Sequence, residues 1–309
     1  MASMMKPLAC RQLGVMISAL LGVLAVLAAW QALYSQPDPA QLFRKTFLQS
    51  LATSGVTIQS DQKAQNAEAR QTVQYSFGAF NISRTLTTLQ QNNTTITDEL
   101  IGTPTTNYTR YVGIQTNQRG ANGKPLNFSS ILNVWATSAV PGPNKISNTS
   151  PLFSQAVLGV GLPVGGTALP IANLPPAARN KLVRLALTGG AYTVDYKKVK
   201  IQKRAGRLQY VYPVSVAPEA YATFMKEAAK AMGLRDLNGL DPASFHGQSA
   251  LQMALTVDVR SAHLVAAQLG GAASSYRQSY GSYDVPVMAS LPTHTISMNE
   301  LQQRLANLR

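Results

Sequence analysis

Apolar and polar side chains alternate over long stretches of this chain, and this period of two constrains its fold more than any other feature of the sequence. In two stretches every second residue is apolar without a break: Leu208, Tyr210, Tyr212, Val214 and Val216 in one, and Leu251, Met253, Leu255, Val257 and Val259 in the other. Successive side chains of a β-strand point to opposite faces, so each stretch predicts a strand with one buried and one solvated face. Such strands are typical of antiparallel sheets.

Further strands and several short helices are predicted after residue 40. Alternation predicts a meander over 69–115 with a turn at "QQNNTT", a long hairpin over 192–216, and a strand pair at 251–259 and 264–269, after which "YDVPVMAS" closes the sheet. Helical spacing is found in 40–54, which ends at Gly55 as a C-cap, and in 131–138, 175–188, 218–232 and the tail 297–308. The sequence therefore predicts an α+β fold, although the Gly- and Pro-rich segment 117–176 gives no definite pattern.

Residues 12–37 carry no charged side chain. At about 1.5 Å rise per residue, a helix over residues 13–34 spans the hydrocarbon core of a bilayer, which is roughly 30 Å thick. Lys6 and Arg11 precede this run, and the positive-inside rule then predicts a cytoplasmic N-terminus and an extracytoplasmic C-terminal part. A signal peptide cleaved after Ala28 is the alternative, because small residues there suit a signal peptidase.

These features divide the chain into five parts: a cytoplasmic tip at 1–12, a single transmembrane anchor at 13–34, a linker at 35–40, an extracytoplasmic domain at 41–290 and an amphipathic tail at 291–309. Cys10 is the single cysteine, so no disulfide forms within one chain. The exported part must hold together by its core, which is reasonable at roughly 270 residues in a chain that is 45% hydrophobic.

Residues that usually carry catalysis or bind metals are scarce. His246, His263 and His294 are the three histidines, and none has a partner at a metal-ligand spacing. The glycine-rich segment 159–166 lacks the Lys-Ser/Thr pair of a phosphate-binding loop. We therefore predict no catalytic residue, no metal and no cofactor. An enzyme acting on wall or glycan is kept as a third alternative, since carboxylates distant in sequence can converge in space.

The chain is basic, with 27 Lys and Arg against 13 Asp and Glu, a net charge of +14. Six basic residues gather in the predicted hairpin: Lys197, Lys198, Lys200, Lys203, Arg204 and Arg207. The alternation assigns the tyrosines of this hairpin to a buried face, whereas proteins that bind nucleic acid expose aromatic side chains beside the charge. Two interpretations stay open, a solvated hairpin tip or a surface that contacts anionic membrane lipid or wall polymer. Nucleic acid is not an expected partner.

The order of the predicted elements resembles the LolA/LppX-LprG family of bacterial envelope proteins. The resemblance covers about residues 40–290 and includes "DELIG…NYTRYVGI", the basic-aromatic hairpin, a crossover helix and the late pair "ALTVDVRSAHLVAAQL". In that pair Val257-Asp258 and Leu264-Val265 match the form common in the family. The resemblance implies a strongly curved antiparallel sheet, a half-barrel, with helices packed on its concave face. This chain lacks the lipidated cysteine that follows the apolar run in lipoproteins, so a protein anchor would replace the lipid.

The same resemblance implies binding of a lipid or another apolar or amphiphilic ligand. The residues expected to line an apolar cavity are Phe77, Tyr210, Tyr212, Phe224, Met225, Met253 and Leu255, and the six basic residues of the hairpin are expected to contact the membrane surface. The alternative is a non-enzymatic structural or protein-interaction component of the envelope, in which the core is filled and envelope proteins are the partners.

Overall fold

The structure, a computed structural model, describes residues 36–309 except for 65, 78–80, 104, 121–122, 140–166, 234–236, 238, 272–273, 288 and 309. The chain divides into two units, Met1–Asp38 and Pro39–Arg309, and all elements named below belong to the second. The predicted cytoplasmic tip and anchor lie outside the described residues. Among the residues that are described, no helix is both long enough and apolar enough to span a membrane.

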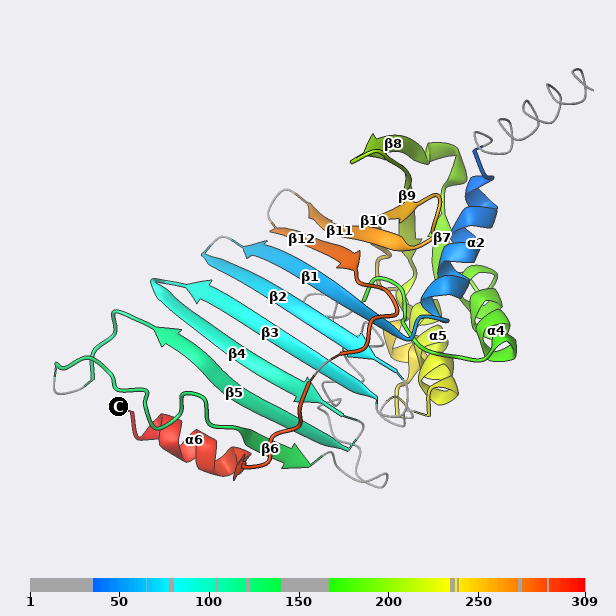
Figure 1. The fold of residues 1–309 in the computed structure, drawn as a ribbon. Helices are drawn as coiled ribbons and strands as arrows, with labels where there is room; N and C mark the ends of the chain where they lie inside the picture. The colour runs from blue at the N-terminus through cyan, green and yellow to red at the C-terminus, as the bar shows by residue number, and fades with distance from the viewer. Residues whose placement is uncertain are drawn as a thin grey trace, which may run out of the picture. The chain divides into compact units, whose positions relative to one another are not determined.

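The described residues form one open, curved, mostly antiparallel sheet of 13 strands (Figure 1). Six strands follow one another in chain order and form the first meander: β1 (Gly55–Ala64), β2 (Ala67–Ser76), β3 (Ile82–Gln91), β4 (Thr94–Gly102), β5 (Thr106–Gln115) and β6 (Ala136–Ala139). In the turn from β3 to β4, Asn92 and Asn93 have φ of 47° and 61°, so the predicted "QQNNTT" turn is confirmed.

The second meander contains the remaining antiparallel strands: β7 (Tyr192–Val194), β8 (Lys200–Arg204), β9 (Arg207–Val216), β10 (Leu251–Asp258), β11 (Leu264–Gly271) and β12 (Ser274–Gly281). Both β7 and β8 pair with β9, and β12 pairs with β1 to join the two meanders. At the far edge, the two-residue strand β13 (Ile296–Ser297) pairs in parallel with β6. The predicted α+β fold with a curved, mostly antiparallel sheet is confirmed.

Three helices lie against the second meander: α2 (Pro39–Ser50), α4 (Pro176–Leu187) and α5 (Pro218–Ala231). Pro176 and Pro218 stand in the first turn of α4 and α5, where a missing N–H costs no hydrogen bond. A fourth helix, α6 (Met298–Ala306), packs with β6 in a small separate cluster of Ile131, Ala136 and Leu301. The predicted helices at 175–188, 218–232 and 297–308 are confirmed.

Aromatic rings dominate the main core beneath these helices. The rings of Phe47, Tyr192 and Phe224 meet edge to face, with centroids 5.2 to 5.9 Å apart, which is the favoured geometry for aromatic pairs. All three side chains are at most 2% exposed. These contacts fix α2 and α5 against β7.

The first predicted helix ends earlier than expected. It stops at Ser50, and Gly55 is the first residue of β1 rather than a C-cap. A Cβ at Gly55 would lie 2.6 Å from the carbonyl oxygen of Val285 and 2.9 Å from that of Tyr75. The glycine is therefore explained by the close approach of two backbone segments, not by helix termination.

Two further predictions were wrong. Residues 131–138 form turns and the start of β6 instead of a helix, and Asn133 has a φ of 59°, which no helix accommodates. The segment 283–290 contributes no strand in its described residues, and the strand that pairs with β11 is β12. The core side chains of β12 are Tyr276, Gln278 and Tyr280, which hydrogen-bond to one another, so this strand lacks the expected apolar alternation.

Candidate functional site

The β8–β9 hairpin carries the predicted basic cluster. Ala205 and Gly206 form its two-residue turn with φ of 49° and 77°, the positive values that a tightly twisted hairpin requires. A short 3-10 helix, Tyr196–Lys198, interrupts the first arm, so the single long hairpin predicted from the sequence is divided into β7 and β8. Every residue from Lys200 to Arg207 is exposed.

The basic side chains of this hairpin are largely unneutralised. Lys198 lies 3.1 Å from Asp195, and this hydrogen bond and charge lower the pKa of the Asp195 carboxyl. The charge of Lys197 adds to this lowering, and the other four basic residues have no side-chain partner among the described residues: Lys200, Lys203, Arg204 and Arg207. A surface of this kind attracts anions and is weakened by salt.

Tyr210 and Tyr212 lie on the other side of β9, as predicted. Tyr210 and Tyr212 are 1% and 0% exposed, and the Tyr212 hydroxyl donates a hydrogen bond of 3.0 Å to the carbonyl of Pro39 at the start of α2. The assignment to the buried face was wrong for Tyr196, which is 38% exposed because the 3-10 helix breaks the alternation there; its ring meets Phe43 edge to face. The buried rings of Tyr210 and Tyr212 are thus unavailable for stacking on a base.

A groove of about 710 Å³ lies beneath the hairpin on the open face of the second meander, which we define as the face opposite to α2, α4 and α5. Pairing between strands places Val211, Thr256, Ala266 and Ser279 in one row across β9, β10, β11 and β12. Small side chains in such a row leave a hollow that the longer side chains around it do not fill. Ala254 and Val265 extend the apolar part of the floor.

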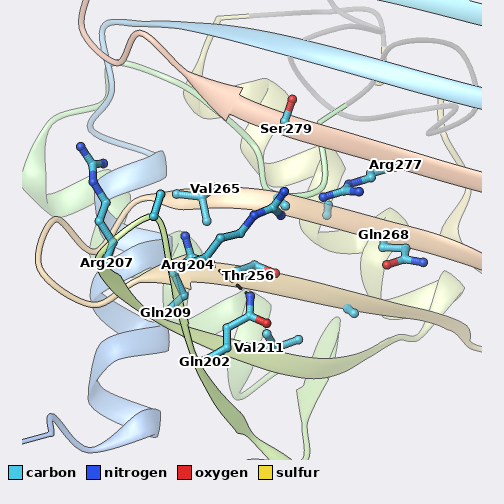
Figure 2. Close-up of a pocket in the computed structure, with 14 residues that line it drawn as sticks. Gln202, Arg204, Arg207, Gln209, Val211, Thr256, Val265, Gln268, Arg277 and Ser279 are labelled. Carbon is cyan, nitrogen blue, oxygen red and sulfur yellow. Dashed lines mark hydrogen bonds between the residues drawn. The ribbon is translucent and has the colours of Figure 1, made fainter.

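The rim of the groove is polar and positively charged. Gln202 donates a hydrogen bond of 3.1 Å to Gln209, which ties the base of the hairpin to the groove wall. Arg204 and Arg207 come from the hairpin and Arg277 from β12, and none of the described lining residues is acidic. Figure 2 shows Arg204 extending over the strands toward Arg277, while Arg207 points away. The groove therefore combines an apolar floor with cationic groups from two separate elements.

The seven residues expected to line an apolar cavity are all buried in the main core: Phe77, Tyr210, Tyr212, Phe224, Met225, Met253 and Leu255. Each is at most 9% exposed, and none of them lines the groove. Their burial is as the sequence predicts. The role of these residues in lining a cavity stays a prediction. The residues that line the groove were not predicted from the sequence.

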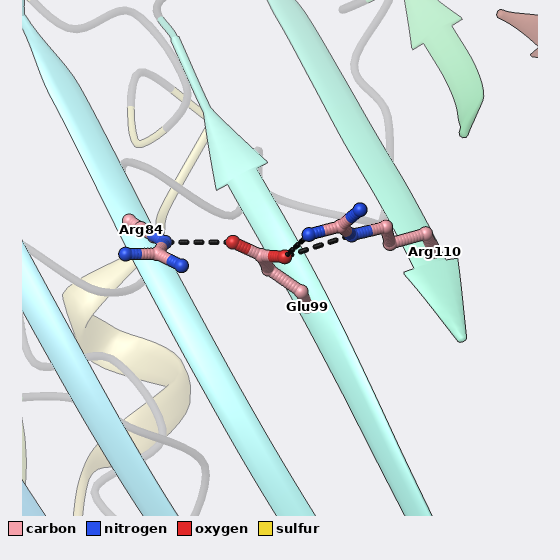
Figure 3. Close-up of polar contacts among 3 residues, drawn as sticks. All are labelled: Arg84, Glu99 and Arg110. Atoms are coloured by element: carbon pink, nitrogen blue, oxygen red, sulfur yellow. Dashed lines mark hydrogen bonds and ion pairs between the residues drawn. The ribbon is translucent and has the colours of Figure 1, made fainter. Parts of the chain in front are cut away.

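A second polar cluster, in the first meander, was also missed from the sequence (Figure 3). The Glu99 side chain is 4% exposed, and its two carboxylate oxygens accept hydrogen bonds from Arg84 Nε at 2.7 Å and Arg110 Nε at 2.8 Å. Arg110 also lies over the Trp135 ring, 4.5 Å from its centroid. Burial raises the pKa of Glu99, but the hydrogen bonds and charges of Arg110 and Arg84 outweigh burial and lower it. Because these groups satisfy one another, the cluster is a structural feature.

Metal chemistry finds no support in the described part of the chain, where no three His, Cys, Asp or Glu side chains gather as a metal site would require. His246 lies 2.9 Å from Glu219 at the surface. His263 stacks on Tyr283 with centroids 3.9 Å apart, and its partial burial lowers the pKa of the imidazole. These histidines occupy separate sites on the domain.

Comparison with known proteins gives a likeness of fold only. No family model matches the chain, and no curated protein matches it in sequence. LprF from Mycobacterium bovis is similar over 83% of this chain and 99% of its own, with 12% identity and a TM-score of 0.40. The lipoprotein LppX from Mycobacterium tuberculosis is similar over 81% and 98%, with 8% identity and a TM-score of 0.33. The predicted resemblance to the LppX family is confirmed as a likeness, and at TM-scores this low it carries no argument about function.

Proposed function

We propose that this protein is a membrane-anchored, extracytoplasmic binding protein of a bacterial cell envelope, without catalytic activity, that takes a lipid or another amphiphile as its ligand. The observation that carries this proposal is the groove on the open face. Its volume of about 710 Å³ lies within the roughly 300 to 1,000 Å³ typical of small-molecule sites. An apolar floor beside a polar rim is the arrangement that suits an amphiphile.

The proposed location rests on the sequence. The uncharged run at 13–34, preceded by Lys6 and Arg11, would anchor the chain with its N-terminus in the cytoplasm. The domain at 41–290 would then lie outside the membrane, with its sheet as a half-barrel whose concave face holds the helices. Protease added to intact protoplasts should digest this domain. If the domain is protected from protease, the topology is the reverse of the one proposed. If the mature protein begins near Ala29, residues 13–34 belong to a cleaved signal peptide and not to an anchor.

The exposed lysines of the hairpin support a further part of the proposal, contact with an anionic surface. Lys200 and Lys203 have no side-chain partner among the described residues, and each basic residue near an anionic bilayer contributes about 1 kcal/mol to attraction. A membrane leaflet or an anionic wall polymer would meet this surface. Such contact would hold the mouth of the groove close to a source of lipid.

The function is tested by purifying the whole 309-residue chain in a neutral detergent and analysing it by native mass spectrometry and lipid extraction. We expect a co-purifying amphiphile at a defined stoichiometry, and saturable uptake of a fluorescent fatty acid. The absence of both results would overturn the binding proposal and favour the alternative, a structural or protein-interaction component of the envelope.

A further inference from the structure

We propose that the groove holds the phosphate headgroup of an anionic amphiphile between Arg204 and Arg277. This inference rests on the proposed function and deepens it by naming the ligand class. Arg204 stands next to the hairpin turn and Arg277 lies in the middle of β12, so the two charges reach the groove from independent elements (Figure 2).

The charge of the groove is not balanced by the protein itself. Arg204, Arg207 and Arg277 have no ion-pair or hydrogen-bond partner for their side chains among the described residues, and no described lining residue is acidic. Asp61 stands opposite Arg277 on β1, but the carboxylate contact found for it is to Arg70, at 4.0 Å. Two guanidinium groups directed toward one another repel, and an anion placed between them turns this repulsion into attraction on both sides.

The geometry suits a phosphate. A guanidinium presents its N–H groups as a planar fork, and a carboxylate has only two oxygens to share between two forks, as Glu99 shares them between Arg84 and Arg110. A phosphate group has further oxygens and accepts hydrogen bonds from two forks that approach from different directions. A pair of arginines on separate elements therefore matches a phosphate that bridges the hairpin and the sheet.

The remaining lining residues fit the rest of an amphiphile. Gln268 lies directly opposite Arg277 in the strand pairing, and Ser279 lies two residues further along β12, so both offer neutral polar groups beside the proposed phosphate. Ala254, Val265 and Ala266 offer an apolar surface for the start of an acyl chain. None of the described lining residues is aromatic, so the groove lacks the stacking surface that a single-stranded nucleic acid would need.

The test measures binding of four soluble probes to the whole chain in a neutral detergent by calorimetry. The probes are dihexanoyl phosphatidylglycerol, the zwitterionic dihexanoyl phosphatidylcholine, inorganic phosphate and an uncharged octyl glucoside. We expect phosphatidylglycerol to bind at least tenfold more tightly than each of the others. If inorganic phosphate binds as tightly as phosphatidylglycerol, the inference that the ligand is an amphiphile is overturned, and the site is assigned to free phosphate.

Three single variants locate the site. Arg204→Gln and Arg277→Gln should each weaken phosphatidylglycerol binding about tenfold, the loss expected for one charged hydrogen-bonding group, and leave the binding of octyl glucoside, which has no phosphate, unchanged. Lys203→Gln is the matched control, because it removes the same charge from the same hairpin but does not line the groove. An equal loss from all three variants would show nonspecific charge attraction and overturn the inference.

A fourth variant tests the floor without altering charge. Ala266→Leu places a larger side chain in the central row of the groove and should reduce phosphatidylglycerol binding by tenfold or more, while circular dichroism confirms the fold. Phosphatidylcholine carries the same phosphodiester beside a cationic choline, so equal binding of the two lipids would show that the net charge of the headgroup plays no part. That result overturns the anionic headgroup and leaves the proposed function intact. Binding of no amphiphile at all overturns both.

Discussion

The second meander packs aromatic rings beneath α2 and α5, whereas the first meander has hydroxyl and charged side chains in much of its length. In the second, Tyr192 and Tyr212 are fully or almost fully buried, as is Phe224 of α5, which packs in the same core. In the first, threonines form cross-strand pairs, such as Thr88 with Thr97 at 3.3 Å, and most residues of β4 and β5 are half-buried. One continuous sheet is thus stabilised in two ways.

The difference indicates where the free energy of unfolding resides. Burying a large apolar side chain contributes about 1.5 to 3 kcal/mol, whereas a cross-strand polar pair contributes about 0.2 to 1 kcal/mol. The first meander also buries apolar side chains where it joins the second, such as Ile58 and Tyr75, and it holds one buried charge, Glu99, between Arg84 and Arg110. We therefore expect a steep gradient of mutational effects from the aromatic core, through Glu99, to the basic hairpin.

The largest effect is expected for Phe224→Ala, at about 3 to 5 kcal/mol of unfolding free energy, because the side chain is 0% exposed among other rings. Denaturant unfolding would be followed by circular dichroism and by Trp135 fluorescence in a Trp30→Phe background. Both signals should shift together, since β1 and β12 join the meanders. Lys230→Ala, on the exposed side of α5, is the control, and an equally small loss from both would show that the core face of α5 is misassigned.

Glu99→Gln should cost about 2 kcal/mol, because it removes the charge that neutralises Arg84 and Arg110 while keeping the side-chain shape. The arginines are 39% and 29% exposed, so solvent limits the loss. Glu68→Gln in the same meander removes an exposed pair with Arg70 and should cost less than about 0.5 kcal/mol. Equal losses in the two variants would mean that burial of Glu99 adds nothing.

The contribution of Glu99 should also depend on pH. Its pKa is lowered in the folded state, so the stabilisation is fully present above the unfolded pKa, about 4.3, and is lost as pH falls through the folded pKa. The difference in unfolding free energy between the wild type and Glu99→Gln should therefore be constant from pH 6 to 5 and shrink toward pH 3. A difference that grows on acidification would contradict the ion-pair assignment.

The smallest effect is expected for Lys200→Ala, within about 0.5 kcal/mol, because the side chain is exposed and has no side-chain partner among the described residues. The same variant should weaken binding to vesicles that contain phosphatidylglycerol if the hairpin faces an anionic surface. A second variant replaces all four hairpin lysines by glutamine. If it binds these vesicles as tightly as the wild type does, the hairpin does not contact the membrane and that part of the proposal is overturned.

Local patterns predicted most of the elements. Alternation found β9 and β10, and helical spacing with a leading proline found α4 and α5. Alternation did not predict β12, because one of its buried positions is Gln278, and a buried polar residue that is hydrogen-bonded gives no apolar signal in the sequence. Strand β1, which lies between the first predicted helix and the predicted meander, was also missed.

The groove could not be predicted in the same way, because it depends on the order of strands. Val211 is distant in sequence from Thr256 and Ala266, and the three form one row only when β9, β10 and β11 pair in register. Arg277 belongs to a strand that the sequence did not reveal. A signal was nevertheless present, since the solvated positions of β10 include the small residues Ala254 and Thr256 where long polar side chains are usual.

The seam between β1 and β12 has a consequence for biosynthesis. Residues 55–64 leave the ribosome long before residues 274–281, by roughly 10 to 40 s at ordinary elongation rates. During that interval the nascent chain presents one side of β1 as an open edge, which invites pairing with other chains. Asp61 and Lys63 place charges on that edge, as gatekeeper residues do. A chain truncated before residue 274 would keep this edge permanently and should aggregate through it.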